Sequence, residues 1–239
     1  MKREFSRIYV KSTHESYETL FSGIKFVDFM ECVSAIENIM VLKGDYWSGK
    51  YWKRFALVEG KGQIDKLCGE NVHNYGDFCF VDYVSPAVID TISNEEAAQL
   101  LYLSHMFEPL SSPFFDVLQN EYAYLAHDDG WYCKLYCRNR QFPITVAVNK
   151  LQKNARNALG DNALPLPENL IEAIHKQSEK GLLIEMEVVS RKKGVLGKKK
   201  VAESASIKLY EVGKYENMDS LLNNIEQNQT KKILHVDLL

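Results

Sequence analysis

The residues that could do chemistry in this chain gather at one predicted turn. His127 is followed by Asp128 and Asp129, and Trp131 comes directly after the glycine of the turn. An imidazole beside a carboxylate can act as a general acid or base, and the same groups can bind a metal. The alternative is turn chemistry, because Asp is favoured in turns for conformational reasons. His127, Asp128 and Asp129 are therefore the candidate catalytic residues, and no metal site is expected.

A second group of side chains is aromatic. Tyr46, Trp47, Tyr51 and Trp52 lie close together in the sequence and are interleaved with basic residues. Trp, Tyr and Arg supply much of the binding energy at protein interfaces, and exposed rings can also stack on a base or a sugar. Alternatively, half of these rings pack into the core, because side chains alternate along a strand. Together with Trp131 they are the expected partner-binding residues.

A basic segment joins two predicted strands over residues 191–200. Its phosphate-binding candidates are Arg191, Lys192, Lys193, Lys198, Lys199 and Lys200. A cationic loop can contact nucleic-acid phosphates, whereas the alternative is a solvated turn that discourages edge pairing. The glycines of the segment do not form a P-loop, because no Gly-Lys-Ser/Thr follows them.

Cysteine and histidine spacing predicts no metal centre and no cofactor. The chain has five cysteines, and an odd count without close pairs argues against a disulfide framework. Cys133 and Cys137 lie on one predicted strand about 13 Å apart, too far to bind one ion together. They are expected to be buried structural thiols. His235 and Asp237 share a face of the last strand but lack a third ligand.

The best-specified element is an antiparallel hairpin over 120–138. A two-residue turn places Glu121 opposite Arg138, whereas a slip of one residue places His127 opposite Trp131. The first register is preferred because it creates an opposite-charge pair and one apolar face. That face contains Tyr122, Tyr124, Ala126, Cys133, Leu135 and Cys137.

Two more hairpins are predicted, over 39–59 and 182–211. In the first, strands near 39–47 and 50–59 turn at Ser48-Gly49, which places Tyr46 opposite Tyr51. Helices are predicted from Ser12 or Thr13 to Phe21 and over 26–37, 61–69, 94–107, 144–159, 168–180 and 216–228. Single strands are predicted over 5–10, 78–84 and 233–238. Ser93 and Glu96 form a capping box at the start of 94–107.

The order of elements predicts an α+β fold, with antiparallel sheets packed against amphipathic helices. Residues 26–84 and 168–238 share the order α-β-β-α-β, which indicates either duplicated split-βαβ units of ferredoxin type or a common α+β order. Pro165 and Pro167 mark a break, so the expected domains are 1–160 and 161–239, with one continuous domain as the alternative.

Composition is that of a globular protein, with 46% hydrophobic residues and a net charge of −3. No long apolar run or secretory signal is recognisable, so a soluble cytoplasmic protein without membrane contact is expected. The first functional hypothesis is a non-catalytic protein that acts through a protein partner, as toxin-immunity proteins do. The alternatives are a hydrolase or nuclease that uses His127, and a nucleic-acid-binding protein that uses residues 191–200.

Overall fold

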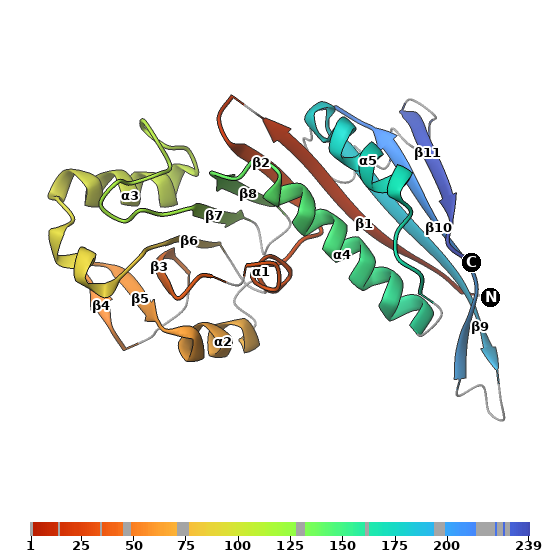
Figure 1. Cartoon of the computed structure of the whole chain (residues 1–239), viewed down its shortest axis with the longest axis horizontal. Coiled ribbons are helices and arrows are strands. Elements are labelled where there is room, and N and C mark those ends of the chain that lie inside the picture. The colour runs from red at the N-terminus through yellow and green to blue at the C-terminus, as the bar shows by residue number, and fades with distance from the viewer. Residues whose placement is uncertain are drawn as a thin grey trace. The chain divides into compact units, whose positions relative to one another are not determined.

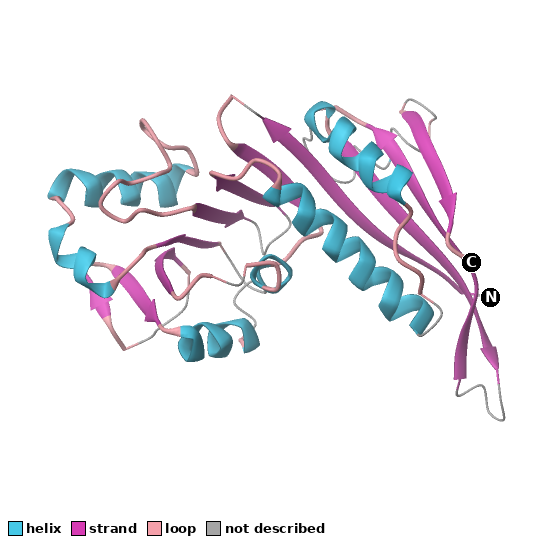
Figure 2. Ribbon diagram, in the orientation of Figure 1, coloured by secondary structure: helices cyan, strands magenta, loops and turns pink. Residues whose placement is uncertain are grey.

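The computed structural model describes residues 2–13, 15–33, 35–44, 49–70, 77–127, 132–160, 163–193, 199–213, 223, 227 and 230–239. Helices and antiparallel strands make up the fold, which confirms the α+β class (Figure 2). The chain forms two compact units (Figure 1), one from residues 1–12 and 144–239 and one from residues 13–143. Within the described part, no helix is long and apolar enough to cross a membrane. The division into folding domains at residue 160 stays a prediction.

The first unit, residues 1–12 and 144–239, is an antiparallel sheet with helices on one face. Its strands, in the order β11-β10-β9-β1, are β11 (Lys231–Asp237), β10 (Lys199–Glu211), β9 (Leu182–Lys193) and β1 (Lys2–Thr13). Its helices are α4 (Phe142–Leu159), α5 (Glu168–Gln177) and the short 3-10 helix η4 (Ser178–Lys180). In Figure 1, α4 and α5 lie over this sheet. Leu151 and Ala155 of α4 are buried, so the unit's core lies between these helices and the strands.

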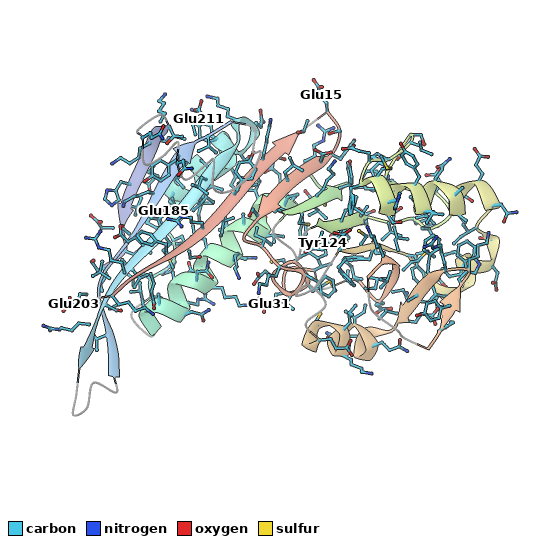
Figure 3. The ribbon with its side chains drawn as sticks, turned by 180° about the vertical axis from the view of Figure 1, so that it is seen from behind. Glu15, Glu31, Tyr124, Glu185, Glu203 and Glu211 are labelled. Atoms are coloured by element: carbon cyan, nitrogen blue, oxygen red, sulfur yellow. The ribbon has the colours of Figure 1, made fainter. Side chains whose placement is uncertain are left out.

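The other face of this sheet is polar. Arg7 Nε lies 2.8 Å from Glu185 Oε2, and Lys208 Nζ lies 2.9 Å from Glu187 Oε2. Figure 3 shows Glu185 on the sheet as seen from behind. Opposite charges on neighbouring strands stabilise a sheet, and here each of the two glutamates of β9 is matched by a cation from a strand beside it.

The second unit, residues 13–143, contains the remaining seven described strands of the antiparallel sheet. Its strands, in the order β2-β8-β7-β6-β3-β5-β4, are β2 (Glu18–Ser22), β8 (Tyr132–Cys137), β7 (Tyr122–His127), β6 (Phe78–Asp82), β3 (Asn38–Lys43), β5 (Phe55–Glu59) and β4 (Tyr51–Trp52). Its helices are α1 (Phe26–Met30), α2 (Lys61–Gly69), the 3-10 helix η1 (Pro86–Thr91) and α3 (Asn94–Met106). The predicted capping box at Ser93 and Glu96 is confirmed, because the Ser93 hydroxyl accepts from the Glu96 amide at 3.1 Å.

Both faces of the second unit's sheet are buried. Leu100 and Leu103 of α3 pack with Met40 and Val81 on one face. The opposite face carries a cluster of aromatic rings, in which Phe80 stacks on Tyr124 at 5.3 Å between ring centroids. The cluster consists of Phe26, Phe29, Phe78, Phe80, Tyr122, Tyr124 and Phe142. Such edge-to-face and stacked contacts add to the free energy of area burial.

The register of the β7–β8 hairpin is the one preferred from the sequence. Tyr122 lies opposite Cys137 and His127 lies opposite Tyr132. The Arg138 amide donates to the Glu121 carbonyl at 3.2 Å, and their side chains approach to 3.8 Å. The predicted apolar face and the opposite-charge pair are therefore confirmed.

The hairpin predicted over 39–59 is partly wrong. Asn38 to Val41 pair with Ala56 to Glu59 in the expected register. The strand predicted over 50–59 instead breaks at Lys53, whose φ is 52°. Tyr51 therefore pairs with Ala56 on the outer edge of β5, and its predicted partner Tyr46 lies outside the described residues. The break gives the sheet one more strand, β4, and places Tyr51 and Trp52 at the sheet edge.

Two predicted helices near the N-terminus are corrected. The segment from Ser12 or Thr13 to Phe21 is not helical, because β1 runs to Thr13 and β2 begins at Glu18. Phe21 lies opposite Cys133 of β8, so a long-range strand partner overrides the local pattern. The helix predicted over 26–37 ends at Met30, and the chain enters β3 at Asn38. Most of the helix predicted over 216–228 lies outside the described residues.

The two αββαβ segments differ in strand order, so the duplication is not confirmed. In residues 26–84 the last strand, β6, pairs with the first strand, β3. In residues 168–238 the last strand, β11, pairs with the second strand, β10. The remaining predicted elements agree with the structure within a few residues at their ends.

We expect Phe80→Ala to lower the free energy of unfolding by about 3–5 kcal/mol, because it empties the centre of the aromatic cluster. Tyr102→Ala, at an exposed position of α3, should change it by no more than about 0.5 kcal/mol. Denaturation with urea measures both values. Equal effects of the two substitutions would contradict this assignment of the core.

Candidate functional site

The edge hairpin, defined here as residues 50–59 with strands β4 and β5, holds two of the predicted partner-binding residues. The Tyr51 side chain is 47% exposed. Trp52 is partly buried and stacks on Phe55 with 6.1 Å between ring centroids. Lys53 Nζ lies 4.7 Å from the Trp52 ring centroid and donates to Asn94 Oδ1 at 2.7 Å. The Trp52 ring is thus packed against Phe55 and also contacted by a cation.

Tyr46, Trp47 and Trp131 lie outside the described residues. The structure therefore brings Tyr51 and Trp52 together at the sheet edge, and the place of the other three rings in a binding surface stays a prediction.

The edge hairpin is tied to the interior of its unit through Glu59. The Tyr83 hydroxyl donates to Glu59 Oε1 at 3.1 Å, and Lys50 Nζ forms an ion pair with Glu59 Oε2. Burial, followed by the nearby Glu59 charge, raises the pKa of Tyr83 well above its usual value. A protonated phenol is the form that donates to a carboxylate. These contacts tie the edge hairpin to the rest of its unit.

Of the three predicted catalytic residues, only His127 lies among the described residues. His127 is the last residue of β7 and lies opposite Tyr132. Asp128 and Asp129 lie outside the described residues. The use of His127 with either aspartate in a hydrolase or nuclease therefore stays a prediction.

The phosphate-binding candidates occupy the ends of two paired strands. Arg191, Lys192 and Lys193 close β9, and Lys199 and Lys200 open β10. Lys198 lies outside the described residues. The structure therefore brings five of the six candidates together at one end of the first unit's sheet.

A buried polar cluster that the sequence did not predict surrounds Lys134 on β8. The Lys134 side chain is 8% exposed, and its Nζ pairs with Glu108 Oε1 and lies 3.5 Å from Glu18 Oε2. The Tyr136 hydroxyl donates to Glu18 Oε2 at 2.9 Å and to Glu108 Oε2 at 3.4 Å. Burial raises the pKa of Tyr136 far above its usual value, and both glutamates act in the same direction.

The Lys134 cluster connects β2, β8 and the chain that follows α3. A buried ammonium is costly without partners, and this one is matched by two carboxylates. Such an arrangement holds three segments together and offers no activated nucleophile. Lys134 and Tyr136 alternate with apolar residues on one strand, which was visible in the sequence. Glu18 and Glu108 come from distant segments, and no local signal pointed to them.

The thiols of Cys133 and Cys137 are buried and unsuited to nucleophilic chemistry. Burial raises the pKa of Cys133 and of Cys137 to about 12, and the thiolate is the reactive form. The prediction that both are buried structural cysteines is confirmed. Over the described part of the chain, no group of three or more His, Cys, Asp or Glu residues could hold a metal ion. His235 Nε2 lies 3.3 Å from Asp237 Oδ1 as an isolated pair.

The pKa of one carboxylate, that of Asp82, is raised strongly by its surroundings. Asp82 Oδ1 accepts from the Tyr122 amide at 2.7 Å and from the Glu121 amide at 3.1 Å. Burial raises the pKa of Asp82 to about 6, and these two amides oppose the shift only in part. Asp82 therefore holds the start of β7 against β6, which is a structural task.

Lys134→Met should lower the free energy of unfolding by ~2–3 kcal/mol, because it leaves the Glu18 carboxylate without its ammonium partner. Adding Glu18→Gln should restore part of that loss, since the uncompensated charge is removed. Guanidinium denaturation of the two single variants and the double variant gives the coupling energy. Additive losses would show that the two side chains do not interact.

The stability of the fold should depend on pH through Asp82. Between the unfolded pKa near 3.9 and the folded pKa of about 6, the folded chain keeps a proton that the unfolded chain releases. The contribution of Asp82 to stability is therefore largest below this window and falls by ~3 kcal/mol as the pH rises through it. Asp82→Asn should flatten this part of the profile in denaturation experiments, whereas the exposed control Asp90→Asn should leave it. An unchanged slope in Asp82→Asn would refute the assignment.

Comparison with known proteins identifies no relative of this chain. No family model matches it, and neither the curated proteins nor the solved structures contain a significant match.

Proposed function

We propose that this chain is a non-catalytic binding protein that acts through a protein partner, with the edge hairpin as its contact surface. The observation that supports the proposal is the exposed Tyr51 ring beside Trp52 on β4. β4 is the last strand of its sheet, so its outer edge pairs with no strand in the described part of the chain. Tyr and Trp are enriched among the residues that dominate protein interfaces.

The rigidity of the edge hairpin favours binding. Ordering a side chain on association costs free energy, and here the Trp52 ring is already positioned by Phe55 and Lys53. A large aromatic ring brings up to about 250 Å² of contact area with few rotatable bonds. A preorganised pair of rings can therefore anchor a partner at low entropic cost.

The charge beside the rings indicates the chemistry of the partner. Lys53 and Arg54, at the turn between β4 and β5, are exposed. A partner surface with Asp or Glu around an apolar centre would match them, and charge complementarity of this kind raises association rates and specificity. Neutralisation of another protein, as in toxin-immunity pairs, is the activity we propose. Cytoplasmic placement is part of the proposal, and the free cysteines support it, because thiols persist in reducing compartments.

Trp52→Ala and Tyr51→Ala should each weaken partner binding by ten-fold or more, since loss of an interface anchor costs about 2 kcal/mol or more. The tagged chain is used to isolate a stoichiometric partner from native cytosol, and calorimetry then compares the variants with that purified partner. Phe5→Ala is the matched control, because Phe5 is also 47% exposed but belongs to β1.

Retained affinity in both hairpin variants, with circular dichroism showing that they are folded, would remove the edge hairpin from the interface. Failure to recover any stoichiometric partner with the unmodified chain would contradict the proposed function itself.

A further inference from the structure

The hairpin of β9 and β10 extends beyond the other strands of the first unit. β1 ends its pairing with β9 opposite Ser190, and β11 ends its pairing with β10 opposite Ser206. Residues 191–193 and 199–201 continue as a two-stranded ladder and pair only with each other among the described strands. Figure 1 shows this end of β9 and β10 projecting past the neighbouring strands. These two stretches are called the basic ribbon below.

The register of the basic ribbon opposes lysine to lysine. Lys192 lies opposite Lys200, and Lys193 lies opposite Lys199. Because successive residues of a strand belong to opposite faces, each face of the ribbon receives one of the two lysine pairs. Both faces of this narrow element are therefore basic by position.

Acidic residues do not offset these four lysines within the ribbon. Neither 191–193 nor 199–201 contains Asp or Glu. The nearest acidic position on either strand is Glu203, which lies beside a register shift and forms an ion pair with Arg191 at 2.8 Å. The Glu203 carboxylate is thus already paired with the Arg191 guanidinium.

Such an arrangement is unfavourable for the isolated fold. Directly opposed like charges in a sheet are destabilising, by an amount similar to the roughly 0.2–1 kcal/mol gained from a favourable pair. Protection of an edge from aggregation requires only single lysines. The glutamates of β9 further along the same strand are each matched by a cation. Among the strand pairs of the first unit that the structure describes, the projecting end of the hairpin is where lysine lies directly opposite lysine, and an external anion would neutralise these charges.

We propose that the basic ribbon binds double-stranded nucleic acid through its phosphates. A duplex presents phosphates on both sides of a groove, which suits an element with lysines on both faces. The major groove of B-DNA, about 12 Å wide, admits a two-stranded ribbon. Lysine contacts to phosphate position a protein without reading sequence, so the binding is independent of sequence.

The inference is separate from the proposed protein interface, because the basic ribbon and the edge hairpin belong to different compact units. Either proposal can therefore be disproved without affecting the other.

The test uses the full chain and the quadruple variant K192Q/K193Q/K199Q/K200Q. Binding of a fluorescent 20-base-pair duplex of random sequence is followed by anisotropy over a range of salt concentrations. If all four lysines contact phosphate, the slope of log affinity against log salt should fall by about 3.6 in the variant. A slope of this size corresponds to a loss of about 10²-fold, between 50 and 200 mM salt, in the affinity that these four lysines contribute.

A control variant with the same change of net charge, K61Q/K66Q/K176Q/K231Q, should keep the slope of the unmodified chain, because these exposed lysines lie elsewhere. K192R/K193R/K199R/K200R should retain binding, since the charges are preserved. The melting temperature of the glutamine variant of the ribbon should equal or exceed that of the unmodified chain, because the like-charge pairs are gone. A fall in melting temperature would contradict the energetic argument.

Absence of duplex binding at 50 mM salt would overturn the proposal, as would equal slopes for the ribbon and control variants. Binding to vesicles that contain phosphatidylserine, with the same lysine dependence but without duplex binding, would assign the ribbon to a membrane surface and also overturn it.

Discussion

The register of the β7–β8 hairpin is the constraint on which the second unit depends. Side chains alternate between the faces of a strand, so a slip of one residue would exchange every contact. In the observed register, Tyr124 joins the aromatic cluster and Leu135 lies opposite it. Lys134 and Tyr136 consequently share the other face, where Glu18 and Glu108 reach them. The aromatic cluster on one face and the Lys134 cluster on the other are two consequences of one pairing.

Charges in this protein follow two different arrangements. Lys134 and Glu185 are nearly inaccessible, and each is matched by an opposite charge from another segment. This is what the cost of burying an ion requires. The basic ribbon departs from this pattern, because Lys192 lies opposite Lys200 at the projecting end of a ladder. Charges matched inside the fold stabilise it, whereas the opposed lysines are the basis of the proposed nucleic-acid contact.

The edge hairpin shows how a local break in a strand can create a surface. Lys53 adopts a left-handed conformation that non-glycine residues rarely take, and the chain reverses there. The sequence predicts that Tyr51 lies opposite Tyr46 in a continuous hairpin, whereas Tyr51 and Trp52 line the outer edge of β5. The conformation of one residue converts rings expected within a hairpin into a candidate contact surface.

The sequence by itself determined the elements whose signals are local. Alternation, the capping box at Ser93 and the charge pair of Glu121 with Arg138 predicted helices, strands and one register correctly, because each depends on neighbouring residues or on a short turn. Only the tertiary structure decided where β1 and β2 run, since the backbone of β2 is satisfied by β8, more than a hundred residues away in sequence. The same holds for the Lys134 cluster. Its members come from separate segments, and a one-dimensional pattern does not contain the pairing that brings those segments together.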